Sequence, residues 1–259
     1  SGVHSPGARF FSVSTDKAAN PVSFMGATKR LMEHVIFKKT ANASLNGGVT
    51  SARFANVAYS QGSLLESFVQ RLEAKTPLAA PIGIKRFFVS LEEAGELCLI
   101  AAILGEGGSI YIPNLDPGEY LVDMQTAAAR FLQANGYKAV SFPLAEQAKA
   151  FEAFSALHNS GKWPLILTPS DTAGEKPFEE FVGQSETALE TNFDALKRIE
   201  FSSDLPTSDL DRLLDHLRDV SPKALTGLTT ESMMEWVADI EPAFRQAHIS
   251  SVVNLDDRI

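Results

Sequence analysis

The sequence predicts an α/β fold built around a parallel sheet. Residues 9–14 form an apolar segment typical of a buried strand, and residues 49–54 form another. The long amphipathic segment between them predicts a helix, and strands joined through a helix run parallel by a right-handed crossover. Strand-like and helix-like segments alternate through most of the 259 residues, which can supply one large core or two modest ones.

The first helix is expected to run from Asn20 to about Lys39. Asparagine is a favourable N-cap, and Pro21 suits the first helical position, where no amide donor is needed. Four residues at spacings of four, three and four would share one face of this helix. A lysine among them either extends to solvent or serves a polar site, because burying an unpaired ammonium group is costly. These four residues are Met25, Lys29, Met32 and Ile36.

Glycines 47 and 48 turn the chain into the second strand. Residues 77–81 are rich in proline and are expected to be irregular, and the segment from Pro169 to Pro177 is expected to be a loop. The pattern of apolar residues assigns the other elements. Helices are expected at 64–74, 91–104, 123–135, 145–158, 208–218 and 231–247, and strands or extended segments at 109–112, 139–142 and 163–168.

The net charge of −9 and the pI of about 5.1 argue against nucleic acid or an anionic membrane as the default partner. An anionic small substrate would need a local basic pocket. No apolar run in this sequence reaches the roughly 18 residues that span a bilayer, and no secretory leader is visible. The single cysteine, Cys98, cannot form an internal disulfide, which favours a reducing compartment and a cytoplasmic location.

Neither a metal site nor a complete dinucleotide site is expected. The histidines have no paired metal-ligand spacing, and no Cys-x-x-Cys or His-Glu-x-x-His motif is present. The glycine cluster at 105–108 follows a helix and precedes a strand, which favours a helix end and turn over a pyrophosphate cradle. A dinucleotide cofactor, if used, would therefore bind mainly through residues outside this sequence.

Thr15, Asp16 and Lys17 follow directly after the first predicted strand. In open α/β sheets, ligands bind beyond the carboxyl ends of the strands, so this triplet stands where a site is expected. The alternative is a turn capped by Asp16 with Lys17 in solvent. A short connection brings the helix and Lys29 toward the same crevice. Together these features favour a catalytic site that holds an acid, a base and a second ammonium group.

The run from residue 12 to residue 21, followed by Met-Gly-Ala-Thr-Lys-Arg at 25–30, resembles the extended short-chain dehydrogenase/reductase family. Within that family the match is to the CapD-like nucleotide-sugar 4,6-dehydratases. These enzymes act on UDP-N-acetylglucosamine in surface-polysaccharide and nonulosonic-acid biosynthesis. The resemblance continues at 52–57, 77–81, 85–89 and 93–97, and more loosely at 161–164 and 171–176 and on to the end.

The resemblance implies the C-terminal part of a doubly wound parallel (Rossmann-type) sheet, with a smaller α/β substrate-binding region and a helical tail. Residues 1–62 would form the C-terminal half of the NAD-binding domain, 63–195 the substrate region with returning sheet elements, and 196–259 the tail. The break near 183–204 is the candidate boundary before the tail. If membrane helices precede this portion, the site would lie at the cytoplasmic face of the membrane. The family also implies at least a dimer.

This sequence departs from the family pattern in two ways. The glycine-rich cofactor turn of the first half of the fold is missing from it. The catalytic tyrosine, normally four residues before the helix lysine, is Met25 here. A thioether cannot deprotonate an alcohol. The resemblance includes a subgroup with methionine at this position, so the change does not by itself imply inactivity.

The reaction implied by the resemblance is dehydration of a UDP-linked N-acetylhexosamine to its 4-keto-6-deoxy form, with a tightly held NAD that is recycled. Lys17 would remove the C5 proton, and Asp16 would protonate the departing C6 hydroxyl. Thr15 would hydrogen-bond near the C4 oxygen. Lys29 would hold the nicotinamide ribose and stabilise charge at that oxygen. The group that takes the C4 hydroxyl proton stays open.

Further binding residues follow from the same resemblance. Asn56, at the end of the second strand, would reach the cofactor or the substrate, or else cap the next turn. Lys85 and Arg86 would supply the local positive charge for the diphosphate, or else lie in solvent. The cofactor-binding residues are expected to be Ser14, Lys29, Phe54 and Asn56, and the substrate-binding residues Asn56, Lys85 and Arg86.

Two alternatives remain open at this point. A UDP-hexosamine 4-epimerase of the same fold would need neither a C5 base nor a C6 acid, so Lys17 favours the dehydratase. A truncated, non-catalytic module that binds nucleotide sugar and dimerises would explain the missing glycine-rich turn.

Overall fold

The computed structural model describes residues 8–41, 48–170, 176–203, 205–219, 229–241 and 244. The chain divides into two compact units, each discontinuous in sequence. The first unit draws on 1–54, 95–114 and 180–250, and the second on 55–94, 115–179 and 251–259. The blocks expected from the sequence are consecutive, whereas these units interleave along the chain. Gly47, the centre of the expected 169–177 loop and most of the expected 171–176 resemblance lie outside the described residues.

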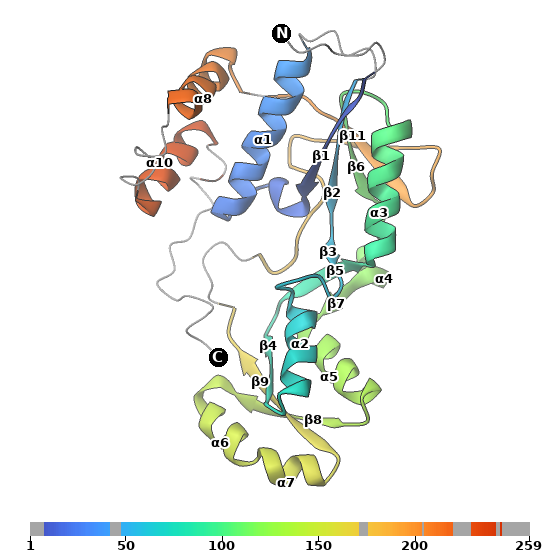
Figure 1. The fold of residues 1–259 in the computed structure, drawn as a ribbon, viewed down its shortest axis with the longest axis vertical. Coiled ribbons are helices and arrows are strands. Elements are labelled where there is room, and N and C mark those ends of the chain that lie inside the picture. The colour runs from blue at the N-terminus through green and yellow to red at the C-terminus, as the bar shows by residue number, and fades with distance from the viewer. Residues whose placement is uncertain are drawn as a thin grey trace. The chain divides into compact units, whose positions relative to one another are not determined.

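The first unit is built on a five-stranded sheet (Figure 1). Its first three strands, β1 (Phe10–Thr15), β2 (Val49–Phe54) and β6 (Ser109–Pro113), run parallel, which confirms the expected parallel sheet. β11 (Leu196–Glu200) pairs antiparallel with β6, and β10 (Ala188–Glu190) pairs antiparallel with β11. Thr15 pairs with Phe54, so β1 and β2 end at the same edge. The strand order is β1-β2-β6-β11-β10.

β10 and β11 were not expected, because the sequence pattern indicated a break over 183–204. Leu196 and Ile199 are buried, but Lys197 and Arg198 between them mask the apolar character of the strand. β11 adds to the sheet by pairing with β6. The expected tail, which began at residue 196, therefore opens with a sheet strand rather than a helix.

Helix α1 (Phe24–Ala41) begins three residues after Pro21, the expected first helical residue. The prediction that Asn20 caps it was wrong, because Asn20 has a left-handed backbone with φ of 49°. Its side-chain oxygen instead accepts from the Gln184 backbone N–H at 2.8 Å. Ser23 takes the capping role, since its hydroxyl oxygen accepts from the Gly26 N–H at 3.1 Å.

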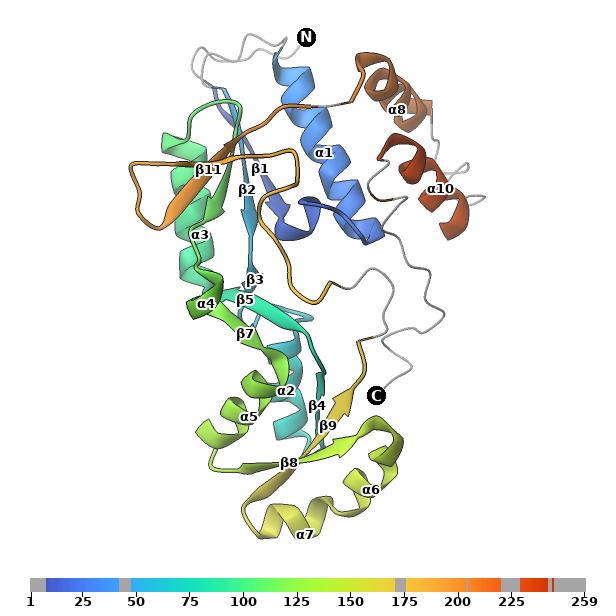
Figure 2. The ribbon, with the colours of Figure 1, turned by 180° about the vertical axis from the view of Figure 1, so that it is seen from behind.

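α1 packs against two later helices, α8 (Thr207–Asp219) and α10 (Thr230–Ile240), which lie beside it in both ribbon views (Figures 1 and 2). The expected apolar stripe of α1 is not its most buried face, since Met25 is 48% exposed. A neighbouring stripe is buried instead, because α1 contacts the sheet on one side and α8 and α10 on the other. The buried residues are Ala27, Arg30, Leu31, Glu33, His34 and Phe37.

Helix α3 (Leu91–Leu99) continues as a single π-helical segment, η2 (Ile100–Leu104). Leu97 and Ala101 pack on Ala52 of β2 and Tyr111 of β6. The glycine cluster 105–108 joins this helix to β6, as expected.

The second unit contains a parallel sheet in the order β4-β9-β8, formed by β4 (Leu78–Pro81), β9 (Lys162–Thr168) and β8 (Lys138–Pro143). The expectation that 77–81 is irregular was wrong, because the flanking prolines hide three buried residues, 78–80. The expected 145–158 helix is interrupted and forms η3 (Leu144–Glu146), α6 (Gln147–Glu152) and α7 (Phe154–Asn159). Other elements are α2 (Leu64–Glu73), β3 (Asn56–Val57), β5 (Lys85–Val89), α4 (Pro117–Tyr120), β7 (Leu121–Asp123) and α5 (Met124–Ala134).

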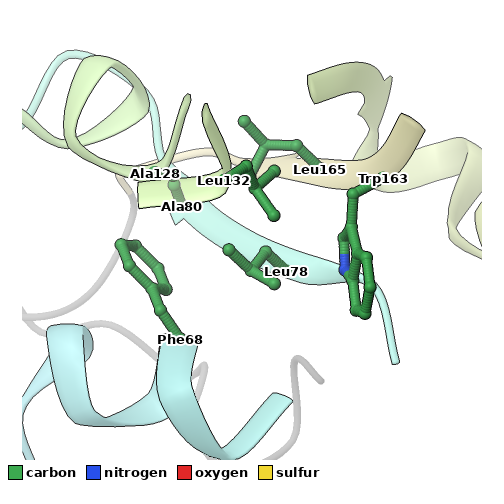
Figure 3. Close-up of a cluster of buried hydrophobic side chains, with 7 residues drawn as sticks. All are labelled: Phe68, Leu78, Ala80, Ala128, Leu132, Trp163 and Leu165. Carbon is green, nitrogen blue, oxygen red and sulfur yellow. The ribbon is translucent and has the colours of Figure 1, made fainter. Parts of the chain in front are cut away.

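The main core of the second unit lies between α2, α5 and the sheet (Figure 3). Phe68 of α2 and Leu78 of β4 are fully buried in it, and the indole N–H of Trp163 donates to the Thr76 carbonyl at 3.0 Å. This bond satisfies the single polar group of the ring. The buried members are Phe68, Leu78, Ala80, Ala128, Leu132, Trp163 and Leu165.

In the part of the chain that the structure describes, no helix combines the length and the apolar character needed to cross a bilayer.

Truncating Phe68 tests this core. Phe68→Ala leaves a cavity between α2 and β4, and we expect it to lower the free energy of unfolding by about 3–5 kcal/mol. Phe151→Ala is the control, because Phe151 is 44% exposed, and it should cost less than about 1 kcal/mol. Urea denaturation followed by tryptophan fluorescence measures both. Equal losses in the two variants would contradict the assignment of Phe68 to the core.

Candidate functional site

Three polar residues converge where β1 ends. The chain passes from Thr15 into a short 3₁₀ turn, η1 (Asp16–Ala18). The Thr15 hydroxyl donates to Asp16 Oδ1 at 2.8 Å, and Lys17 Nζ lies 3.2 Å from the same oxygen. The Lys17 backbone N–H donates to Thr15 Oγ1 at 3.4 Å. The structure therefore brings a hydroxyl, a carboxylate and an ammonium group into direct contact at the expected edge of the sheet.

Asp16 is 1% exposed, which is unusual for a carboxylate. Its second oxygen, Oδ2, is buried and has no hydrogen-bond partner among the described residues. Leaving a buried acceptor unsatisfied costs free energy, so such an atom calls for an explanation. The Asp16 carboxyl is thus buried with one of its two oxygens unpaired among the described residues.

Gly26 lets α1 lie directly against the turn. A Cβ atom built on Gly26 would overlap the backbone carbonyl oxygen of Lys17, so no other residue fits without displacing the turn. The backbone N–H of Ala19 donates to the Asp16 carbonyl at 3.1 Å and closes the turn on its other side. The Met25-Gly26 step thus fixes the position of the Thr15–Lys17 segment relative to the helix.

Lys29 and Met25 lie on the same helix. Lys29 Nζ donates to the Val13 carbonyl of β1 at 3.4 Å, which places its ammonium group beside the strand that carries the triplet. Met25, which the resemblance predicts at the position of a tyrosine, is 48% exposed and carries no titratable proton.

Ser14 is the expected cofactor residue on β1. Because side chains alternate along a strand, it lies on the opposite face of β1 from Thr15. Its hydroxyl donates to Glu33 Oε1 of α1 at 2.6 Å. Phe54, the last residue of β2, packs at the margin of the cluster formed by Ala52 and Leu97.

Asn56, Lys85 and Arg86 belong to the second unit. The Asn56 amide donates to the Phe87 carbonyl at 3.2 Å, within the β3–β5 pair. Arg86 Nη1 donates to the Lys176 carbonyl at 3.0 Å, and the Lys85 backbone N–H donates to the Pro177 carbonyl at 2.7 Å. These contacts hold the chain at 176–177 against β5, while the Lys85 side chain is exposed.

Sequence reasoning missed a buried cluster of charges next to the triplet. Arg53, the fifth residue of β2, donates to Glu33 through Nε at 2.9 Å and through Nη2 at 2.7 Å. It also donates to both oxygens of Glu186, at 2.6 and 2.8 Å. Arg30 of α1 contacts both glutamates. We call Arg30, Glu33, Arg53 and Glu186 the charge cluster.

The charges of this cluster stabilise one another. Burial disfavours charge on Arg53, but hydrogen bonds and attraction from Glu33 and Glu186 outweigh it and raise the pKa of the guanidinium. Burial likewise opposes charge on Glu186, yet bonding to Arg53 and the charge of Arg30 lower the pKa of its carboxyl to about 2. Arg53 and Glu186 thus stay ionised against each other.

His34 lies next to the charge cluster on α1. Its Nδ1 is 2.7 Å from the Ser203 hydroxyl, and its Nε2 is 3.9 Å from Glu241. Burial, reinforced by the charge of Arg30, lowers the pKa of His34 to about 3, although Glu186 opposes this. His34 and Arg30 line a pocket of about 420 Å³ whose lining contains none of the residues from Thr15 to Lys17. This pocket also borders α8 and α10 and is separate from the triplet.

Replacing Gly26 tests the close packing at the turn. Alanine favours a helix over glycine, but Gly26→Ala would push against Lys17 and should destabilise the protein by about 1–3 kcal/mol while lowering turnover. Gly95→Ala in α3 is the matched control, because a Cβ there meets nothing within 4 Å. It should stabilise by up to about 1 kcal/mol. Thermal unfolding and product formation would be compared, and equal effects would contradict the close approach.

The buried His34 predicts acid sensitivity. Unfolding restores its ordinary pKa of 6.5, so below that pH the unfolded chain gains a proton that folded His34 does not. Stability should fall by about 2 kcal/mol between about pH 7 and pH 5. Glu186 adds a further loss only as the pH falls below its unfolded value of 4.5 toward 2. Urea unfolding of His34→Gln should show a flatter dependence, whereas His158→Gln, which retains His34, should keep it; an unchanged slope in His34→Gln would refute the assignment.

Comparison with known proteins supplies the family. A family model described as polysaccharide biosynthesis protein matches residues 4–200. The capsular polysaccharide biosynthesis protein CapD of Staphylococcus aureus is 34% identical over 131 residues, 50% of this chain and 21% of the relative. A UDP-N-acetylglucosamine 4,6-dehydratase (inverting) of Campylobacter jejuni is 36% identical over 124 residues, 45% of this chain and 36% of the relative.

Epimerases also match, and so does a solved structure. The UDP-glucose 4-epimerase of Rickettsia canadensis is 34% identical over 102 residues, 39% of this chain and 30% of the relative. The X-ray structure of Pen from Bacillus thuringiensis superposes with a TM-score of 0.58 at 18% identity, over 82% of this chain and 63% of that one, and so shares the fold. The chain spans roughly a fifth to a third of the length of these curated relatives. On the match over residues 4–200, the chain belongs to the polysaccharide biosynthesis protein family.

Proposed function

We propose that this chain carries the acid–base machinery of an NAD-dependent UDP-N-acetylhexosamine 4,6-dehydratase, with UDP-N-acetylglucosamine as substrate. The observation that carries the proposal is the contact of Thr15 and Lys17 with one oxygen of the buried Asp16. An elimination needs an acid and a base that reach neighbouring carbons of one sugar ring. Adjacent residues on a tight turn satisfy that requirement.

In the proposed reaction, Lys17 acts in its neutral amine form and removes the C5 proton, and Asp16 in its protonated form protonates the C6 hydroxyl, so that water leaves. NAD, when bound, would accept hydride from C4 and return it to C6. The Asp16 carboxyl, which Thr15 and Lys17 contact through Oδ1, is the group we assign to the C6 hydroxyl. Lys17 then returns its proton to C5. The product is a 4-keto-6-deoxy sugar that still carries UDP.

The C4 hydroxyl proton needs an acceptor, since Met25 cannot serve. The Thr15 hydroxyl donates to Asp16 at 2.8 Å, so the Thr15 oxygen retains lone pairs that can accept a hydrogen bond from the C4 hydroxyl. We assign the route from the C4 oxygen through Thr15 to Asp16. Asp16 afterwards delivers a proton to the C6 oxygen. The balance closes, because the proton lost at O4 leaves in the water and the C5 proton returns.

Lys29 is proposed to bind the nicotinamide ribose and to stabilise negative charge at the C4 oxygen. The hydrogen bond of its ammonium group to the Val13 carbonyl, near the end of β1, supports this assignment. The described residues hold no glycine-rich turn between a strand and a helix, so they fit part of a dinucleotide site and not the whole. β1 is the terminal strand of the described sheet, and we propose that a nucleotide-binding half extends the sheet beyond it.

The remaining assignments are proposals of the same kind. We propose that Ser14 of β1 and Phe54 of β2 contribute to the cofactor site, since both strands end at this edge of the sheet. Asn56, Lys85 and Arg86 are proposed to contact the nucleotide sugar, with Arg86 also anchoring the chain at 176–177. We further propose a cytoplasmic site and a homo-oligomer.

A 4-epimerase is the second candidate, supported by the epimerases among the relatives. It would oxidise C4 and return hydride to the same carbon, with no water lost. The mass of the product formed by the full-length protein separates the two reactions: a mass lower by one water with UDP retained supports the dehydratase. Unchanged mass with altered C4 configuration supports the epimerase, and no turnover with retained UDP-sugar binding supports a non-catalytic module.

Lys17→Ala tests the role of the base. The full-length variant should still bind NAD and the UDP-sugar, and formation of the keto product should fall by a factor of about 10²–10⁴. Lys149→Ala is the control, because the Lys149 side chain is 67% exposed on the second unit, and it should retain turnover. Product is measured by mass spectrometry and binding by calorimetry. Turnover by Lys17→Ala at the rate of the parent enzyme would remove Lys17 from the mechanism.

A further inference from the structure

The charge cluster reaches the catalytic edge through one hydroxyl. Ser14, which is 3% exposed, donates to Glu33 Oε1 at 2.6 Å. The same glutamate oxygen accepts from Arg53 Nε at 2.9 Å. The other glutamate oxygen accepts from Arg53 Nη2 at 2.7 Å. The bidentate Arg53–Glu33 pair is therefore complete without Ser14, whose hydroxyl adds a tie to β1.

Ser14 and Glu33 flank the proposed catalytic groups on their two elements. Ser14 comes two residues before Asp16 on the strand, and Glu33 comes four residues after Lys29 on the helix. Residues four apart lie on the same side of a helix. The Ser14–Glu33 bond thus joins the end of β1 to the face of α1 from which Lys29 reaches the Val13 carbonyl. A shift of α1 along β1 would break it.

We propose that Ser14 and Glu33 are positioning residues, whose hydrogen bond holds the Asp16–Lys17 turn in register with Lys29. This proposal rests on the dehydratase function above. The contact is short and buried on both sides, since Glu33 is fully buried. Arg53 of β2 also donates to Glu33 and to Glu186. These bonds restrict the position of the Glu33 carboxylate, which accepts the hydrogen bond of Ser14. Because rates depend steeply on the placement of reacting groups, a small slip at this bond should slow the chemistry.

The structure supplies a matched control for this bond. Ser51 of β2 is also a buried serine, 1% exposed, and its hydroxyl donates to the Ser12 carbonyl of β1 at 2.8 Å. Both buried serines thus make a hydrogen bond that involves β1, at Ser12 and at Ser14, two residues apart along that strand. Ser51 ties β2 to β1, whereas Ser14 ties α1 to β1. A purely structural role would therefore give similar consequences for both.

The experiment compares Ser14→Ala, Ser14→Thr and Ser51→Ala in the full-length enzyme. We expect the two alanine variants to lose similar amounts of thermal stability. Ser14→Ala should lower kcat at least tenfold with KM within about twofold of the parent, while Ser51→Ala keeps kcat within about twofold. Ser14→Thr, which retains the hydroxyl, should restore most of kcat.

The outcomes separate the two levels of the proposal. If the parent enzyme forms no keto product, the dehydratase function fails before positioning is tested. If the parent is active and both alanine variants lose kcat equally, or Ser14→Ala keeps full kcat, the positioning role is overturned. A rise in KM at unchanged kcat for Ser14→Ala would also overturn it, because that pattern indicates lost ground-state binding rather than misplaced catalytic groups.

Discussion

The sharing of the Arg53 guanidinium between the buried Glu33 and the half-buried Glu186 is the interaction on which the first unit depends. It joins β2, which carries Arg53, to α1 through Glu33 and to the segment near residue 186 through Glu186. Removing one partner from such a buried pair leaves an uncompensated charge and costs about 3–5 kcal/mol. Arg53 Nη1 also donates to the Phe181 carbonyl at 2.9 Å, which fastens the chain where it enters the unit again.

The proposed catalytic edge, where β1 ends and the Thr15–Lys17 segment begins, depends on this arrangement. α1 is fixed against β1 by polar contacts to Val13 and Ser14, and Gly26 lets the helix touch the turn that follows the strand. Within that frame, Asp16 can be buried with one oxygen unsatisfied, because the surrounding contacts over-determine its position.

Local sequence signals fixed the parallel strands and most helices, because apolar periodicity and turn residues act over short stretches. They failed where long-range pairing decides: Leu78–Pro81 forms a strand by pairing with β9, and Leu196–Glu200 by pairing with β6. At the site, the Thr15–Lys17 triplet could be found from its place after a strand. The charge cluster could not, because Glu33, Arg53 and Glu186 are far apart in sequence and each alone resembles a surface charge. The prediction that Asn20 caps α1 failed for a related reason, because the Asn20 side-chain oxygen accepts from the backbone of the sequence-distant Gln184 instead.

The interleaving of the two units has a consequence for synthesis. β10, β11 and Glu186 complete the first sheet and its charge cluster, yet they follow the last long segment of the second unit in the chain. During synthesis, β1, β2 and β6 therefore leave the ribosome well before β11, the antiparallel neighbour of β6, and before β10. Residues 115–179, with β8, β9 and their helices, emerge in between. Residues 55–94 and 115–179 of the second unit can therefore fold before β10 and β11 are added to the first sheet.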